Sequence, residues 1–186
     1  MDSPFQATCL NLGCGKGIRV TTDSEKWINL DMFPNPGVDV VHDLENPLPF
    51  EDESIDAILA SHVLEHIKNW TGLMKECHRV LRPRGVLHIK VPEARCRAAY
   101  ADPTHINYFV PETWLHFAKE IDIGFDTAEG LREWNLCWNE HIAHYRSGID
   151  DGVPGNYFSE LLVDLEKPGP KYEWEIAVEK VQNVQQ

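Results

Sequence analysis

A short apolar strand that leads directly into a glycine-bearing loop, followed by an isolated carboxylate, constrains this chain more than any other feature. Residues 9–17 read Cys-Leu-Asn-Leu-Gly-Cys-Gly-Lys-Gly, and the next apolar run ends at Asp31. Glycines such as Gly13 and Gly15 let the backbone turn sharply and approach a ligand closely. A carboxylate at the end of the next strand can accept hydrogen bonds from both hydroxyls of a ribose. The pair predicts a nucleoside pocket at the carboxyl edge of a parallel sheet.

Apolar runs alternate with helical and turn-rich segments along the first half of the chain. Five strands are predicted, over residues 7–12, 27–30, 38–42, 55–60 and 86–91. Apolar side chains recur at helical spacing from about Val63 to the breaker Arg82-Pro-Arg-Gly85. Residues 158–165 and 172–178 flank a Pro-Gly turn and predict an antiparallel hairpin. The alternation predicts an α/β fold, with a doubly wound, mostly parallel sheet covered on both faces.

The connection between the first two predicted strands is unusually short. Only nine residues separate Gly17 from Trp27, and residues 21–24 (Thr-Thr-Asp-Ser) are poor helix formers. The first crossover helix is therefore expected to be reduced or missing. Because a phosphate group would lose the helix terminus that usually binds it, the pattern favours a cofactor without phosphate over a dinucleotide.

Length and cysteine content indicate one domain in a reducing compartment. The 186 residues suit a single domain over 1–186, with an insertion on the acceptor side at about 96–157 and a disordered tail at 181–186. Five cysteines form no CxxC pair, and the amino terminus lacks the pattern of a secretory signal. No apolar run is long enough to cross a membrane. We expect a cytoplasmic protein with no membrane partner, and its oligomeric state is left open.

The charge balance bears on the class of substrate. Seventeen basic residues face 30 acidic ones, which gives a formal net charge of −13. Nucleic-acid binding draws most of its affinity from lysine and arginine on phosphates. The sequence therefore predicts no nucleic-acid partner.

Five motifs in order resemble the class I S-adenosylmethionine-dependent methyltransferases, and most closely their small type 11 branch. They are Leu-Asn-Leu-Gly-Cys-Gly, Trp-Ile-Asn-Leu-Asp, His-Asp-Leu-Glu-Asn-Pro-Leu-Pro-Phe, Ser-His-Val-Leu-Glu-His and Arg-Val-Leu-Arg-Pro-Arg-Gly-Val-Leu. The resemblance covers about residues 7–117. It implies a Rossmann-like, seven-stranded sheet whose last strand is antiparallel, S-adenosyl-L-methionine as cofactor, and methyl transfer to a small-molecule or saccharide acceptor.

The resemblance also implies roles for particular residues in cofactor binding. Gly13 and Gly15 would line the methionine part, Asp31 would hold the ribose, and Asp43 with Leu44 would meet the adenine. The other residues that we expect to bind the cofactor lie beside these or face the reacting methyl group; they are Cys14, Met32, Ser61 and His62.

The segment Asp102-Pro-Thr-His105 follows the fifth predicted strand, where an acceptor pocket should open. Since histidine titrates near neutrality, His105 or His62 could take a proton from an acceptor hydroxyl during catalysis. In the structural alternative, Asp102 and Thr104 cap the next helix and His105 packs against Trp114 or Phe109.

Two histidine patterns in the sequence could bind a metal, but no metal is expected. His62-Val-Leu-Glu65-His66 fits the H-x-x-E-H pattern of zinc peptidases, with a third ligand downstream. A zinc hydrolase would leave the glycines and Asp31 unexplained, so Glu65 and His66 are interpreted as a structural pair. His141 and His144 are interpreted as surface residues. A further alternative is a catalytically silent module that keeps the cofactor pocket and presents an interaction surface.

Overall fold

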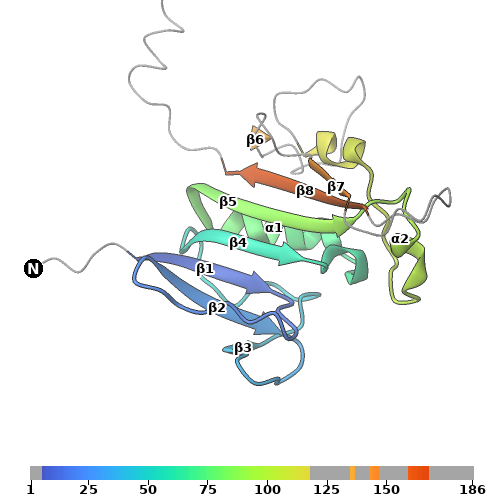
Figure 1. The fold of residues 1–186 in the computed structure, drawn as a ribbon. Helices are drawn as coiled ribbons and strands as arrows, with labels where there is room; N and C mark the ends of the chain where they lie inside the picture. Colours follow the sequence, from blue (N-terminus) through green and yellow to red (C-terminus); the bar gives the residue numbers. More distant parts are fainter. Residues whose placement is uncertain (1–5, 118–134, 137–142, 147–158, 168–186) are drawn as a thin grey trace, which may run out of the picture.

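The computed structural model describes residues 6–117, 135–136, 143–146 and 159–167, and a mixed β-sheet forms its centre (Figure 1). Its strands are β1 (Ala7–Leu12), β2 (Glu25–Asp31), β3 (Val40–Val41), β4 (Ile55–Ser61), β5 (Leu81–Pro92), β6 (Asn135–Leu136), β7 (Ala143–Arg146) and β8 (Ser159–Glu166). The spatial order is β3-β2-β1-β4-β5-β8-β6, and β7 also pairs with β8. Strands β1 to β5 are parallel and β8 is antiparallel to β5, so the predicted Rossmann-like α/β class is confirmed.

The strand order places a crevice at the carboxyl end of β1. From β1 the chain first adds β2 and β3 on one side, and then adds β4 and β5 on the other. Connections therefore leave the neighbouring strands β1 and β4 in opposite directions, and a crevice opens where they part. Strand β2 extends to Asp31, so this carboxylate lies at the same edge of the sheet as the loop that follows β1.

No helix lies between β1 and β2 or between β2 and β3, as the short first connection predicted. Two buried asparagines on these strands hold the first loop instead. The side-chain amide of Asn11 donates to the carbonyl of Gly17 at 2.9 Å, and the Asn29 Oδ1 atom accepts from the backbone N–H of Arg19 at 2.8 Å. Polar side chains on the strands thus form hydrogen bonds with backbone groups of this loop, in the place where a crossover helix would otherwise pack.

The crossover between β4 and β5 contains α1 (Trp70–Val80), which lies against one face of the sheet (Figure 1). Asn69 caps its amino end by accepting from the backbone N–H of Gly72 at 3.2 Å. Its inward residues Leu73, Met74 and Cys77 are almost fully buried. Among the described residues, α1 is the α-helix that connects two parallel strands. It covers one face of the sheet.

Three shorter helical segments complete the described part: η1 (Leu64–His66), α2 (Ala98–Ala101) and η2 (Pro111–His116). The segment η1 follows β4 directly, and α2 follows β5 (Figure 1). Both therefore lie at the carboxyl edge of the sheet. None of the helices in the described ranges is both long and apolar enough to cross a membrane.

Strand β5 begins earlier than predicted. The helix ends at Val80, and the segment expected to be a turn forms the start of β5, with a register shift opposite Ile55 and Ala57. Arg84 has a left-handed backbone (φ 67°), and its N–H donates to the carbonyl of Lys167. The Pro-Gly signal therefore marks a bulged strand rather than a break between elements.

The antiparallel end of the sheet differs in detail from the prediction. The first strand of the predicted hairpin is β8, while its predicted partner at 172–178 lies outside the described residues. Eight strands are described rather than seven. Strands β6 and β7 pair with opposite ends of β8, so these two short strands share the place of one longer edge strand.

Candidate cofactor and acceptor site

The loop after β1 turns on two glycines with left-handed backbones, Gly13 (φ 56°) and Gly15 (φ 51°). A Cβ atom on Gly13 would lie 2.7 Å from Cγ2 of Val63, so this glycine lets the loop pack against the turn after β4. A Cβ atom on Gly15 would meet nothing within 4 Å, because this glycine borders open space. Cys14 between them is buried, and burial together with nearby Asp31 raises the pKa of its thiol.

Asp31 is held by backbone groups on both sides. Its Oδ2 atom accepts from the N–H of Gly15 at 2.7 Å, and its Oδ1 atom accepts from the N–H of Phe33 at 2.9 Å. The side chain is buried, with 7% exposure. Each carboxylate oxygen has a second lone pair, so the group is fixed in place and can still accept from a ligand.

A cavity opens over this carboxylate, and it is bounded by the ends of β1, β2, β3 and β4. Its lining residues are Gly13, Gly15, Asp31, Met32, Phe33, Asn35, His42, Asp43, Leu44, His62, Val63, His66 and Ile67. Most of the residues expected to bind the cofactor are therefore brought together here. Cys14 and Ser61 are not among the lining residues, although both lie next to residues that are.

His42, which was predicted only as the end of a strand, also lines this cavity. Its Nε2 atom is buried and has no hydrogen-bond partner among the described residues. Asp43 follows it, and its Oδ1 atom accepts from the N–H of Glu45 at 3.0 Å. The sequence could have indicated His42 as a cavity residue, because it precedes Asp43 at the end of β3, and this strand ends at the same edge of the sheet as Asp31.

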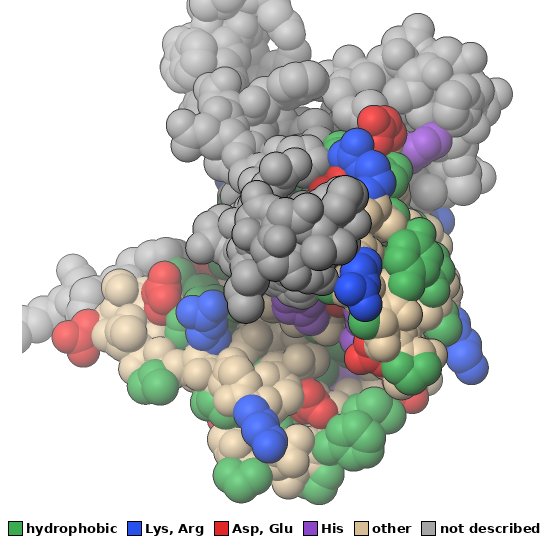
Figure 2. All heavy atoms as spheres, turned by 45° about the vertical axis from the view of Figure 1, so that its right-hand side comes forward, with side chains coloured by type: hydrophobic (Ala, Val, Ile, Leu, Met, Phe, Trp, Pro, Cys, Tyr) green, Lys and Arg blue, Asp and Glu red, His purple; other side chains and the backbone are tan. Residues whose placement is uncertain are grey.

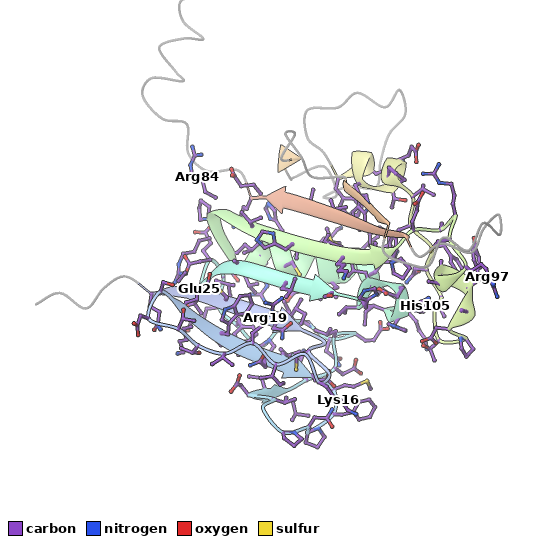
Figure 3. The ribbon with its side chains drawn as sticks, viewed as in Figure 1. Lys16, Arg19, Glu25, Arg84, Arg97 and His105 are labelled. Carbon is purple, nitrogen blue, oxygen red and sulfur yellow. The ribbon has the colours of Figure 1, made fainter. Side chains whose placement is uncertain are left out.

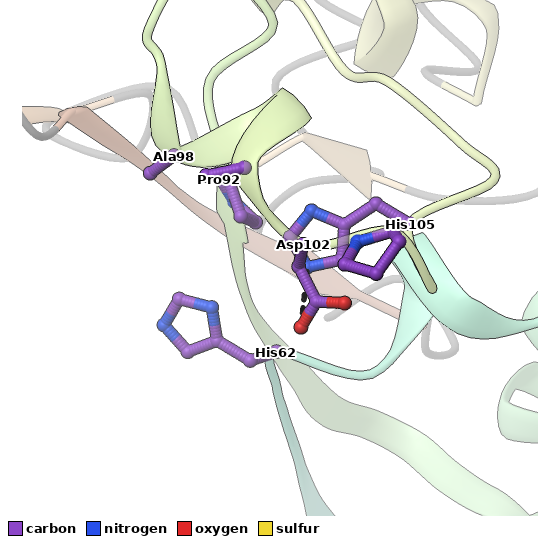
Figure 4. A pocket seen from close by; sticks show the side chains of 7 residues that line it. His62, Pro92, Ala98, Asp102 and His105 are labelled. Atoms are coloured by element: carbon purple, nitrogen blue, oxygen red, sulfur yellow. Dashed lines mark ion pairs between the residues drawn. The ribbon is translucent and has the colours of Figure 1, made fainter.

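A second cavity adjoins the first and is lined by His62, Pro92, Ala98, Ala101, Asp102, Pro103 and His105 (Figure 4). His62 borders both cavities and has a left-handed backbone (φ 56°), which places it at the turn after β4 rather than in a helix. In Figure 2 histidine side chains gather in a hollow on this side of the molecule. Figure 3 shows His105 at the carboxyl edge, far from Glu25 and Arg84 at the opposite end of the sheet.

His105 is positioned from both sides of its ring. Its Nδ1 atom lies 2.8 Å from the carbonyl of Ala99, so Nδ1 carries a proton and donates to this oxygen. The Nε2 atom lies 4.0 Å from Oδ2 of Asp102 (Figure 4). Asp102 caps the local turn, and hydrogen bonds from the hydroxyl and the N–H of Thr104 lower the pKa of its carboxyl group.

The structural alternative for this segment made two predictions, one for Asp102 and Thr104 and one for His105, and the structure differs from both. Asp102 and Thr104 bond each other within the turn that ends α2, and they do not cap the next helical segment, which begins at Pro111. The ring of His105 packs edge-on against His66, with ring centroids 4.8 Å apart. His105 therefore lies in a histidine pair at the border of the cavities.

The comparisons with known proteins agree with this geometry. Residues 10–89 match the family model described as "Methyltransferase domain". A Mycolicibacterium smegmatis protein, named a probable S-adenosylmethionine-dependent methyltransferase, is 39% identical over 95 residues, which are 45% of this chain and 37% of that protein. The chain aligns with between 31 and 41% of the length of the three curated relatives it matches.

Solved structures support the fold at lower sequence identity. The YcgJ protein of Bacillus subtilis has a TM-score of 0.60 at 12% identity, over 90% of this chain and 95% of that one. A Burkholderia thailandensis 1,6-didemethyltoxoflavin-N1-methyltransferase, solved with S-adenosylhomocysteine, has a TM-score of 0.54 at 17% identity, over 89% of this chain and 72% of that one. Together with the family match over residues 10–89, this fold agrees with the resemblance to the class I S-adenosylmethionine-dependent methyltransferases. The family match and the Mycolicibacterium smegmatis relative also agree with the predicted likeness to the type 11 branch, and with S-adenosyl-L-methionine as the cofactor.

Proposed function

We propose that this protein is a methyltransferase that transfers the methyl group of S-adenosyl-L-methionine to a small-molecule or glycan-type acceptor. The observation that carries the proposal is the contact between two cavities. One holds the glycine loop and Asp31, the other holds His105, and His62 borders both. A cofactor in the first cavity would direct its reactive end toward the second.

The residues of the first cavity fit a nucleoside cofactor. Gly15 leaves an open cradle beside the fixed carboxylate of Asp31, which we assign to the ribose hydroxyls. The unpartnered Nε2 atom of His42 points to a missing polar ligand. Asp43 and Leu44 are assigned to the adenine and Gly13 to the methionine part, with Met32 bordering the cavity. Cys14 and Ser61 are assigned supporting positions next to the lining.

When bound, S-adenosyl-L-methionine supplies an electrophilic methyl group, so the protein's main task is to orient an acceptor in line with it. For an oxygen acceptor, His105 can accept the hydroxyl proton at Nε2, because its Nδ1–H already donates to Ala99. His62, at the border of the cavities, is the second candidate for this base. General-base assistance of this kind contributes roughly 10²–10⁴-fold.

Calorimetric titration with S-adenosylhomocysteine tests the cofactor half of the proposal, with one molecule bound per chain expected. A screen of small-molecule and saccharide acceptors with isotopically labelled methyl donor then tests the transfer half. Labelled product from at least one acceptor supports the proposal. Cofactor binding with no turnover across the screen would instead favour a silent module of the same fold.

A further inference from the structure

The carboxylate of Glu65 is buried, and within the described part of the chain no hydrogen bond stabilises its charge. The residue is 1% exposed, and neither Oε1 nor Oε2 accepts a hydrogen bond from the residues that the structure describes. The nearest recorded cation is His62, whose Nδ1 lies 3.3 Å from Oε1, and this pair is ionic only when His62 is protonated. Because burying an uncompensated carboxylate is costly, a ligand with positive charge is expected beside it.

Two imidazoles next to Glu65 each donate their Nδ1–H to an oxygen of the protein. The Nδ1 atom of His66 lies 3.0 Å from the hydroxyl oxygen of Thr104. That hydroxyl donates to Asp102, so it accepts from His66, which carries its proton on Nδ1. His105 likewise donates Nδ1–H to the carbonyl of Ala99. In the neutral form of both rings, Nε2 is therefore the nitrogen whose lone pair can bind a metal.

The polar ends of three side chains lie close together here. One ligating atom from each of Glu65, His66 and His105 lies within 4.8 Å of those of the other two. We propose that these residues bind one divalent transition-metal ion, of the zinc class, with a coordination position left open. Two imidazoles and one carboxylate form a donor set used by catalytic zinc sites, and imidazole favours such metals over magnesium or calcium.

The backbone holds the two halves of this site together before any ion binds. The carbonyl of Glu65 accepts from the N–H groups of Ile106 (2.8 Å) and Asn107 (3.1 Å). The side-chain amide of Asn107 donates to the carbonyls of Leu64 and Ile67, at 2.9 and 2.7 Å. The segment after α2 is thereby fastened to η1, so little ordering remains to be done when an ion arrives.

The site differs from the zinc-peptidase pattern considered from the sequence. That pattern uses His62 and His66 from one helix, whereas here His62 lies in a left-handed turn and the second histidine comes from the loop after α2. The expectation of no metal rested on treating Glu65 and His66 as a structural pair. The approach of His105, about forty positions away in the sequence, changes that assessment.

The position of the ion has a consequence that rests on the proposed function. His66 lines the first cavity and His105 the second, so the ion lies between the cofactor and the acceptor. Its open position can hold an acceptor oxygen and lower the pKa of its hydroxyl group. His105 then acts as a ligand, and His62 is the residue placed to receive the proton.

Titration of metal-stripped, tag-free protein with Co²⁺ and Zn²⁺ tests the site directly. We expect one equivalent to bind, with a visible Co²⁺ spectrum typical of nitrogen and oxygen ligation. The substitutions Glu65→Gln, His66→Gln and His105→Gln should each weaken Zn²⁺ affinity by at least about 10–100-fold, since the loss of even a supporting residue costs that much. Circular dichroism confirms that each variant is folded.

Two control variants separate this site from incidental binding. His88→Gln changes an exposed histidine of β5, and a double His141→Gln, His144→Gln variant removes the other candidate pair. Both should bind the ion as the parent does. No stoichiometric binding, or binding lost in the double variant and kept in His66→Gln and His105→Gln, would overturn the proposal. Because the titration requires neither cofactor nor acceptor, its failure is distinct from failure of the proposed function.

Discussion

The N–H of Gly15 donates a 2.7 Å hydrogen bond to the carboxylate of Asp31, which joins the loop after β1 to the end of β2. The same carboxylate accepts from the N–H of Phe33. One side chain thus shapes both loops that border the first cavity and is itself part of the lining. Its substitution should affect both the loops and the ligand.

Replacing Asp31 by alanine should weaken S-adenosylhomocysteine binding by about 1–3 kcal/mol, because a charged acceptor for two hydroxyls is lost. Asp39→Ala is the matched control. Asp39 also bonds a backbone N–H, that of Asn29 at 2.8 Å, but it does not line the cavity. Calorimetry should show a large loss for the first variant and an unchanged affinity for the second. Equal affinities in both variants would mean that the ribose lies elsewhere.

The two glycines of the loop should respond differently to alanine. Each substitution forces a left-handed backbone on an L-residue, at about 1–2 kcal/mol. Gly13→Ala also places its Cβ against Val63, so it should destabilise the protein by about 1–3 kcal/mol more than Gly15→Ala. Gly15→Ala fills open cavity space, so it should lose more cofactor affinity than its stability cost explains. Urea denaturation and calorimetry on both variants separate these effects.

His105→Ala should leave cofactor affinity nearly intact and slow methylation of a hydroxyl acceptor by roughly 10²–10⁴-fold. The reason is that His105 lines the second cavity and is absent from the lining of the first. Single-turnover rates with saturating cofactor measure the effect. A fully active variant would return His105 to a purely structural role.

Glu76 makes the stability of the fold depend on acid pH. Hydrogen bonds from Arg79 and from the N–H of Leu48 lower the pKa of its carboxyl group in the folded state. A group whose folded pKa is depressed stabilises the protein above its unfolded pKa, and this contribution is lost as pH falls through the folded value. Glu76→Gln should therefore destabilise the protein by about 1–3 kcal/mol at neutral pH and progressively less in acid.

Denaturation of the Glu76→Gln variant at pH 7 and at lower pH values checks this dependence. Glu51→Gln is the control, since Glu51 is an exposed acid in the same connection that Arg79 fastens to α1. A Glu76→Gln penalty that stays constant down to strongly acid pH would contradict the account.

Much of the first cavity followed from local pattern. The glycines follow one apolar run and the carboxylate ends the next. Because neighbouring parallel strands end at the same edge of a sheet, both could be placed at that edge from the sequence. The missing first helix could be predicted from nine intervening residues. Its replacement could not, since Asn11 and Asn29 act through contacts that depend on the register of β1 and β2.

The arrangement of residues around the second cavity could not be predicted from the sequence, because it depends on contacts between distant segments. Periodicity predicted a helical segment from about Val63, but a short 3₁₀ segment follows the left-handed turn at His62, and Glu65 is buried there. His105 reaches His66 through hydrogen bonds from Ile106 and Asn107 to η1. Tertiary contacts of this kind cannot be predicted from residue spacing. The sequence therefore identified Glu65, His66 and His105 as candidates but did not predict that they lie together.

A crystal structure of the protein with S-adenosylhomocysteine tests the central claim most directly. The account predicts the ribose hydroxyls within hydrogen-bond distance of the Asp31 carboxylate, and the homocysteine sulfur directed toward His62 and the second cavity. A nucleoside bound elsewhere on the molecule, or a sulfur directed away from His105, would contradict it.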